Sequence, residues 1–352
     1  NVPYYVFGRG SLAQLGDLLK PRREAVDGPV VYFVDHFFRD HELIGRLPME
    51  KGDQLHFVDS SSEPEVTRID AFKEAVSAAD SRTPCCVVGI GGGNALDTAK
   101  AVANLLTNPG KAEDYQGWEL VKNPAVYKIG IPTLSGTGSE CSRTCVLTNI
   151  PKNLKLGMNS DYTVYDQLLL DPDLLATVPR DQYFYTGIDT FMHCVESLQG
   201  SYRNAIIDAF SVRAVQLCEE IFLSDDMMSE ENREKMMIAS YIGGMAAGNV
   251  GVIHPFSAGL GVVLHVAHGL GNCLALNVLG DIYPKEYKQF RTMIERQGVN
   301  LPTGICKDLT EEQYEGLYRG CIVHEKPLTN ALGPDFKQIL TRENLIERYK
   351  SI

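Results

Sequence analysis

Four residues in the second half of the chain have the types and spacing of a divalent-metal site: Asp189, His193, His254 and His268. Asp189 and His193 are four residues apart, so a helix would place both side chains on one face. His254 and His268 would add two further imidazoles. A set of one oxygen and three nitrogens suits zinc or ferrous iron, so the pattern predicts a metal centre.

Each part of this pattern has a simpler explanation when it is taken alone. An Asp–His pair at helical spacing is usually a surface pair, and a single histidine in an apolar stretch is usually a core residue. Four of the eight histidines, however, fall in one apolar, glycine-rich part of the second half of the chain: His193, His254, His265 and His268. Burying several imidazoles there without a partner would be costly, which favours the metal interpretation.

A glycine-rich segment upstream, Gly89 to Lys100, predicts a nucleotide-binding loop. It follows a predicted strand and opens a helix, so its backbone can approach a pyrophosphate at the helix N-terminus. The residues placed to do so are Gly91, Gly92, Gly93 and Asn94, with Asp97 one turn further on. The usual GxGxxG spacing is not matched, and the alternative is a tight turn that packs a helix on a sheet.

A second loop, from Ile131 to Glu140, also follows a predicted strand. It combines hydroxyls with small residues where the carboxyl edge of a sheet should face a cofactor, and the expected lining residues are Thr133, Leu134, Ser135 and Thr137. Asp35 ends the first clear strand. A carboxylate there would accept hydrogen bonds from an adenosine ribose and repel a 2′-phosphate, which favours NAD over NADP, although aspartates are common at strand ends.

Two halves of different periodicity must position these residues. Short β-rich runs at 29–35, 85–90 and 127–132 are apolar on both faces and alternate with helical segments, which predicts a parallel sheet in an α/β domain over residues 1–178. From residue 179 the period becomes helical, as in 205–223, 230–247, 284–297 and 311–320. We therefore expect an all-helical domain over residues 179–352, after a connection bracketed by prolines 172 and 179.

Composition narrows the class of partner. A chain of 352 residues with a net charge of −12 lacks the electrostatic attraction on which nucleic-acid and anionic-membrane binding depend, so a small molecule is the expected partner. Nine scattered cysteines suggest reduced thiols and a cytoplasmic location. The apolar stretch from Ala258 to Gly280 carries two histidines and many glycines, which predicts a buried core helix rather than a membrane span. Asn1 is not an initiator methionine, so trimming is expected, and no secretory signal is expected.

Together these motifs resemble the iron-containing, or group III metal-dependent, alcohol dehydrogenase family. The resemblance spans nearly the whole chain, through VFGRG at 6–10, GGGNALDTAK at 91–100, IPTLSGTGSE at 131–140, the Asp189–His193 pair and the two histidines that end in HGLGN. It implies a Rossmann-like domain followed by a helical metal-binding domain, as in dehydroquinate synthase. It also implies NAD, one divalent metal, iron or zinc, and a homodimer or larger assembly.

The resemblance assigns roles to particular positions. It implies that Asp189, His193, His254 and His268 are metal ligands, and that the glycine loop holds the pyrophosphate. It also places Lys155 near the cofactor ribose. Such a metal would polarise the substrate hydroxyl as a Lewis acid, and hydride would pass to the nicotinamide.

Two departures from the family pattern concern catalysis. Most members carry a histidine four residues after the third ligand, where this chain has Ala258. We therefore expect His265 to relay the proton if a helix turns it towards the same cavity. A core or supporting role for His265 is the alternative. Arg143 stands where relatives have an apolar or small residue, so it is a candidate for holding an anionic substrate group, with a surface salt bridge as the alternative.

Within the family the chain looks most like the branch that oxidises the C8 hydroxyl of the acidic lipopolysaccharide sugar 3-deoxy-manno-octulosonate (Kdo). A dehydrogenase of small primary alcohols or diols is one alternative. A lyase of the dehydroquinate synthase type is another, although its usual glutamate ligand and basic pocket are not evident. A non-catalytic protein that binds NAD or metal is the third, and the complete ligand set disfavours it.

Overall fold

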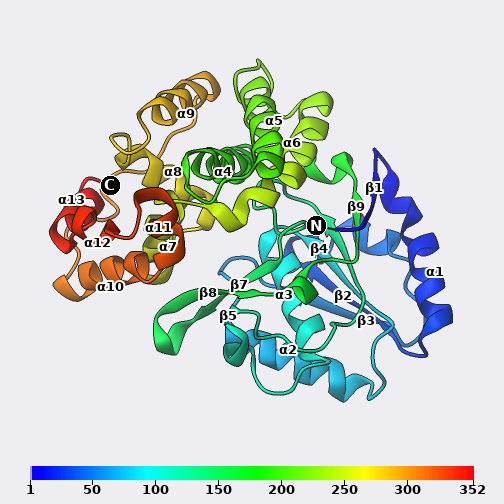
Figure 1. Cartoon of the computed structure of the whole chain (residues 1–352). Coiled ribbons are helices and arrows are strands. Elements are labelled where there is room, and N and C mark those ends of the chain that lie inside the picture. The colour runs from blue at the N-terminus through cyan, green and yellow to red at the C-terminus, as the bar shows by residue number, and fades with distance from the viewer. Residues whose placement is uncertain (1) are drawn as a thin grey trace. The chain divides into compact units, whose positions relative to one another are not determined.

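The computed structural model describes residues 2–352, and contacts between residues divide them into two compact units. The first comprises the chain up to Leu134, with Ser139–Ile150 and Lys155–Thr177. The second comprises Ser135–Gly138, Pro151–Leu154 and Val178–Ile352. Figure 1 traces the chain through both.

The first unit is built on a parallel six-stranded sheet with the strand order β1-β9-β6-β4-β2-β3. These strands are β1 (Tyr4–Phe7), β2 (Val30–Asp35), β3 (Gln54–Val58), β4 (Cys86–Gly91), β6 (Lys128–Pro132) and β9 (Gln167–Leu170). A smaller sheet has the order β5-β8-β7, formed by β5 (Gly117–Trp118), β7 (Thr144–Asn149) and β8 (Leu154–Asn159). β4 and β6 lie at the centre of the larger sheet, and both are therefore buried along their whole length.

Helices cover both faces of the larger sheet (Figure 1). They are α1 (Leu15–Ala25), α2 (Val66–Ala79) and α3 (Gly93–Leu105). Along β2, Val31 and Phe33 belong to the cluster that contains α2 and α3, whereas Tyr32 and Val34 belong to the cluster that contains α1. Alternate side chains of one strand therefore enter two separate cores, which explains why the run is apolar on both faces.

The second unit is helical. Its main helices are α4 (Arg180–Gln199), α5 (Ala205–Phe222), α6 (Glu230–Gly243), α7 (Ile253–Leu264), α8 (His268–Val278), α9 (Pro284–Gln297) and α10 (Glu311–Ile322). The shorter α11 (Glu325–Leu332), α12 (Phe336–Ile339) and α13 (Arg342–Lys350) follow. Side chains cap several starts, as Asn204, Ser229 and Thr310 do for α5, α6 and α10. Contacts join α4 to α5 and α8, and α7 to α8 and α10.

This architecture confirms the predicted fold class, a parallel-sheet α/β domain followed by a helical domain. One predicted element is wrong in detail. The stretch from Ala258 to Gly280 is not one helix, because His265 adopts a left-handed backbone (φ 55°) that ends α7, and α8 begins at His268. The last turn of the predicted 230–247 helix likewise tightens into a 3-10 segment, Gly244–Asn249.

Within residues 2–352, no single helix is long and apolar enough to cross a membrane; α6 with its 3-10 extension passes that test only together with α7, across a bend of 91°. The nine cysteines all lie among the described residues and are buried free thiols.

Candidate functional site

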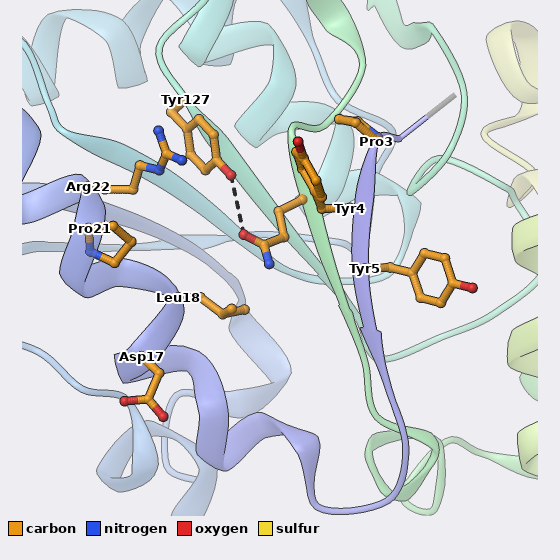
Figure 2. A pocket seen from close by; sticks show the side chains of 9 residues that line it. Pro3, Tyr4, Tyr5, Asp17, Leu18, Pro21, Arg22 and Tyr127 are labelled. Carbon is orange, nitrogen blue, oxygen red and sulfur yellow. Dashed lines mark hydrogen bonds between the residues drawn. The ribbon is translucent and has the colours of Figure 1, made fainter.

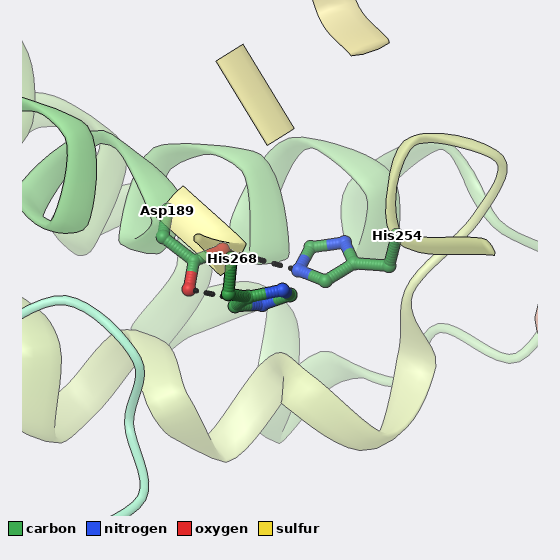
Figure 3. A group of neighbouring side chains, drawn as sticks. All are labelled: Asp189, His254 and His268. Carbon is green, nitrogen blue, oxygen red and sulfur yellow. Dashed lines mark hydrogen bonds and ion pairs between the residues drawn. The ribbon is translucent and has the colours of Figure 1, made fainter. Parts of the chain in front are cut away.

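The metal set is assembled in the second unit from three helices. Asp189 lies on α4, His254 on the first turn of α7 and His268 at the start of α8. One candidate ligand atom from each of these residues lies within 4.8 Å of the other two (Figure 3). The figure shows the Asp189 carboxylate facing both imidazole rings.

The distances within this cluster match what one ion requires of its ligands. Asp189 Oδ1 is 3.1 Å from His254 Nε2, and Asp189 Oδ2 is 3.5 Å from His268 Nε2. Two ligands of a tetrahedral zinc ion lie about 3.3 Å apart when each bond is about 2.0–2.1 Å. Asp189 is fully buried, and its Oδ2 accepts no hydrogen bond. A buried carboxylate oxygen of this kind normally has a partner, so the residues present fit a divalent cation.

His193 lies beside this cluster but outside the group of three. Its ring stacks on that of His254, with centroids 4.4 Å apart, and its Nε2 is 3.8 Å from Asp189 Oδ1. Burial lowers the pKa of His193 to about 3, against the attraction of Asp189, so the ring is neutral at pH 7. The neutral imidazole is the form that binds metals.

Two carboxylates control the charge of His254. Burial alone would lower its pKa, but the negative charge of Glu196 and the hydrogen bonds to Asp189 and Glu196 raise the pKa to about 9. Burial opposes ionisation of Asp189 as well, yet the surrounding histidines His193, His268 and His254 hold the pKa of that carboxyl well below its usual range. Asp189 therefore carries a negative charge at neutral pH, which a divalent cation can balance.

Two buried residues complete the site and were not predicted from the sequence. Glu196, on α4, is hydrogen-bonded to Nδ1 of His254. Asn272, one turn after His268 on α8, donates to Asp189 Oδ1 at 2.7 Å and lies 3.2 Å from His268 Nε2. The available signal was their helical spacing, because Glu196 follows His193 by three residues and Asn272 follows His268 by four.

Some of the predicted cofactor residues lie together at the carboxyl end of the sheet in the first unit. The chain leaves β2 for β3 at one edge and then returns to β4 on the other side of β2, so the strand order reverses between β2 and β4. Ligands of open α/β sheets bind at such a reversal. Asp35 ends β2 and Gly91 ends β4, so both lie at this position.

The glycine loop is closely packed there. A side chain at Gly91 (φ 153°) would place its Cβ 2.6 Å from Ala95 Cβ and 3.0 Å from Asp35 Cβ, so only glycine fits. Ser60, which was not predicted, follows β3 and donates to Asp35 Oδ1 at 2.9 Å. Asn94 donates to the carbonyls of Ser60 and Ser62. Gly92 is the N-cap of α3 and Gly93 is its first residue, so the N–H groups of this helix start lie where the sequence predicts a phosphate cradle.

Other predicted cofactor residues have structural partners. Asp97 accepts hydrogen bonds from Ser139 Oγ and from the Val146 N–H, which ties α3 to β7. Lys155 lies on β8 of the smaller sheet, where its ammonium is 3.1 Å from Glu63 Oε1. These contacts do not connect Asp97 or Lys155 to the cluster formed by Asp35, Gly91 and Asn94.

The second predicted loop is divided between the two units. Thr133 and Leu134 belong to the first unit, whereas Ser135 and Thr137 belong to the second. Within the second unit this loop is fixed on α4, because Thr190 Oγ1 donates to the Gly136 carbonyl at 3.0 Å. Thr190 directly follows Asp189, so the loop supports the helix that carries the central carboxylate.

The structure does not support the geometry expected for the two catalytic candidates. His265 is exposed and does not lie on a helix, because its left-handed backbone separates α7 from α8. The helical placement on which its relay role depended is therefore wrong. Arg143 is 39% exposed at its side chain and pairs with Glu119 and Asp161, which is the surface salt bridge foreseen as the alternative.

A surface pocket of about 540 Å³ lies elsewhere in the first unit, between α1 and β1 (Figure 2). Its lining includes Tyr4, Arg22 and Tyr127, and the Arg22 guanidinium stacks on the Tyr127 ring. None of the predicted metal or cofactor residues lines it.

Comparison with known proteins identifies the family. Residues 3–172 match the family model described as iron-containing alcohol dehydrogenase, and residues 183–316 match the model of the C-terminal part of the same family. The chain belongs to the iron-containing alcohol dehydrogenase family. This confirms the family that the sequence motifs indicated.

Individual relatives of this family differ in their named substrates. The chain is 34% identical over 220 residues to a sulfoacetaldehyde reductase of Bilophila wadsworthia, an alignment that covers 61% of this chain and 56% of that relative. It is 29% identical to an NAD-dependent methanol dehydrogenase of Bacillus methanolicus, covering 77% and 71%. The crystal structure of a sulfoacetaldehyde reductase from Bifidobacterium kashiwanohense in complex with NAD+ is similar in fold, with a TM-score of 0.80, 24% identity and coverage of 98% and 96%.

Proposed function

We propose that this chain is an alcohol oxidoreductase that uses NAD and one divalent metal ion, iron or zinc, to interconvert a primary alcohol and its aldehyde. The observation that carries the proposal is the cluster in which ligand atoms of Asp189, His254 and His268 lie within 4.8 Å of one another. His193, stacked on His254, is the proposed fourth ligand. Membership in the iron-containing alcohol dehydrogenase family supports the same reaction class.

We assign metal binding to residues of the second unit and cofactor binding to residues of the first. When bound, the metal supplies Lewis-acid polarisation of the substrate oxygen, and the nicotinamide supplies the hydride acceptor. Asp189 contributes the negative charge that balances the cation, and the histidines contribute neutral nitrogen donors. In the first unit, Asp35 and the Gly91–Asn94 loop are proposed to hold the adenosine ribose and the pyrophosphate.

We propose small primary alcohols and their aldehydes as the substrate class, because relatives are named for methanol and sulfoacetaldehyde. Oxidation of the C8 hydroxyl of Kdo is a narrower hypothesis within the same reaction. The short chain and its altered histidine pattern suggested it, and Arg143 was compatible with it as an anchor for the anionic group. That arginine pairs with two surface carboxylates. Kdo is therefore one substrate to test rather than the substrate that the site favours.

The decisive experiment is NADH formation by protein reconstituted anaerobically with Fe2+ or Zn2+. The panel contains methanol, 1,3-propanediol and Kdo, and sulfoacetaldehyde with NADH tests the reverse direction. Metal-dependent turnover that is lost in His254→Ala supports the proposal. The matched control is His56→Ala, a histidine of the first unit whose ring stacks on Phe33, which should keep its turnover.

Two other results would redirect the assignment. Consumption of a substrate with NAD bound but no net NADH would indicate the lyase alternative. Metal and NAD binding with no turnover of any alcohol or aldehyde would leave the non-catalytic alternative.

A further inference from the structure

Glu196 is a buried carboxylate behind the metal set, and it lies on the same helix as Asp189 and His193. Its side chain is 1% exposed. Oε1 accepts a hydrogen bond from the Ile253 N–H at 2.6 Å and lies 3.3 Å from the Tyr283 hydroxyl. Oε2 is hydrogen-bonded to Nδ1 of His254. A buried carboxylate is tolerated only when its oxygens are satisfied in this way.

The bond to Nδ1 determines which nitrogen of His254 remains available. A carboxylate can only accept a hydrogen bond, so Nδ1 of His254 carries a proton. Nε2 is hydrogen-bonded to Asp189 Oδ1 at 3.1 Å inside the cluster, and a metal ion that binds there would take the place of the Nε2 proton. We infer that Glu196 is the positioning residue of the metal set, which orients His254 and selects the tautomer whose Nε2 can bind the ion. This inference rests on the proposed function, because it assumes a metal at that cluster.

Glu196 also fixes the helix that carries His254. Ile253 is the first residue of α7, and the residue before it, Val252, offers no side-chain cap. The carboxylate of Glu196 therefore caps α7 from a neighbouring helix, where the helix dipole favours a negative charge. The Tyr283 hydroxyl extends the cap by accepting the Val252 N–H at 3.0 Å. The start of α7 and the ring of the next residue are thus held by one side chain.

A glutamine at this position cannot perform both tasks. Its amide has one acceptor oxygen, whereas Ile253 N–H and His254 Nδ1–H each need one. If the oxygen serves Ile253, the amide NH2 faces Nδ1 and favours the opposite tautomer of His254, which carries its proton on Nε2. Glu196→Gln therefore preserves side-chain volume while it disturbs the one nitrogen that the metal needs.

The test measures metal affinity rather than turnover. Metal-free protein is titrated with Zn2+ against a chelator of known affinity, and Glu196→Gln should bind about 10–100-fold more weakly than wild type. The control is Asp171→Asn. Asp171 is another fully buried carboxylate, and it accepts three backbone N–H groups, from Gly10, Leu12 and Asp173, but it lies in the first unit. Its affinity for Zn2+ should stay within about twofold of wild type.

The outcomes separate this inference from the proposed function. If wild type binds no Zn2+, the proposed function fails. If wild type binds Zn2+ and Glu196→Gln binds it equally well, or if Asp171→Asn is weakened to the same degree, the positioning role alone is refuted.

A second measurement needs no Glu196 variant. Nitrogen-15 NMR of the zinc-loaded protein, labelled at histidine and assigned with His254→Ala, reports which ring nitrogen carries the proton. A proton on Nδ1 of His254 supports the inference, and a proton on Nε2 overturns it.

Discussion

Gly269 determines how closely the helix that carries His268 approaches the helix that carries Asp189. An ideal Cβ at this position would lie 2.5 Å from the Tyr185 carbonyl oxygen and 2.8 Å from its carbon, both in the backbone of α4. An ordinary contact is at least 3.4 Å. Because backbone atoms cannot swing aside as a flexible side chain can, Gly269→Ala must move the start of α8 by about 0.9 Å.

That displacement is large for a metal site. His268 directly precedes Gly269, and its Nε2 is 3.5 Å from Asp189 Oδ2. Metal–ligand bonds tolerate about 0.2 Å, and a misplacement of about 1 Å can cost about 100-fold in function. We therefore expect Gly269→Ala to weaken Zn2+ binding by about 10–100-fold and to lower the free energy of unfolding by about 1–3 kcal/mol.

The assay combines chelator-competition titration with thermal unfolding of the metal-free protein. The control is Gly248→Ala, in the same unit, where an added Cβ meets nothing within 4 Å. That variant should bind Zn2+ as wild type does. If Gly269→Ala is folded and binds Zn2+ with unchanged affinity, the close packing of α8 on α4 does not position His268, and the reasoning is refuted.

Three further predictions concern the cofactor, the substrate and stability. Asp35→Ser should raise the ratio of kcat/KM for NADP to that for NAD by about tenfold, because the carboxylate no longer repels a 2′-phosphate; an unchanged ratio would remove Asp35 from the cofactor site. Arg143→Ala should leave the relative rates on acidic and neutral substrates within about twofold, because surface ion pairs are worth about 0–1 kcal/mol, and selective loss on Kdo would restore the pocket role. Burial opposes the ionisation of Asp53, but hydrogen bonds from Arg23 and from backbone N–H groups hold its pKa below the usual value. The ionised Asp53 carboxylate therefore stabilises the folded state above pH about 4, and this stabilisation is lost as the pH falls through the lowered pKa. In urea unfolding, Asp53→Asn should therefore cost about 3 kcal/mol at pH 7 and less in acid, and a cost independent of pH would contradict this.

The elements of the fold could be predicted because their signals are local. The apolar run at 29–35 is buried in two cores at once, as its β2 strand shows, and the cap residues Asn204 and Thr310 stand where α5 and α10 begin. The run of glycines from Gly91, which ends β4, to Gly93, which begins α3, marked the nucleotide loop. Each of these features depends on residues within a few positions of one another.

Sequence by itself determined the chemical types at the site: one carboxylate and three imidazoles, on elements whose period is helical. Only the tertiary structure decided how they meet. It joined Asp189 to His254 and His268 across three helices, left His193 stacked at the side, and turned His265 outward through one left-handed residue. It also gave Glu196 its place behind His254. A local pattern records which side chains share a face, whereas the distance between side chains 65 or more positions apart depends on how whole helices pack.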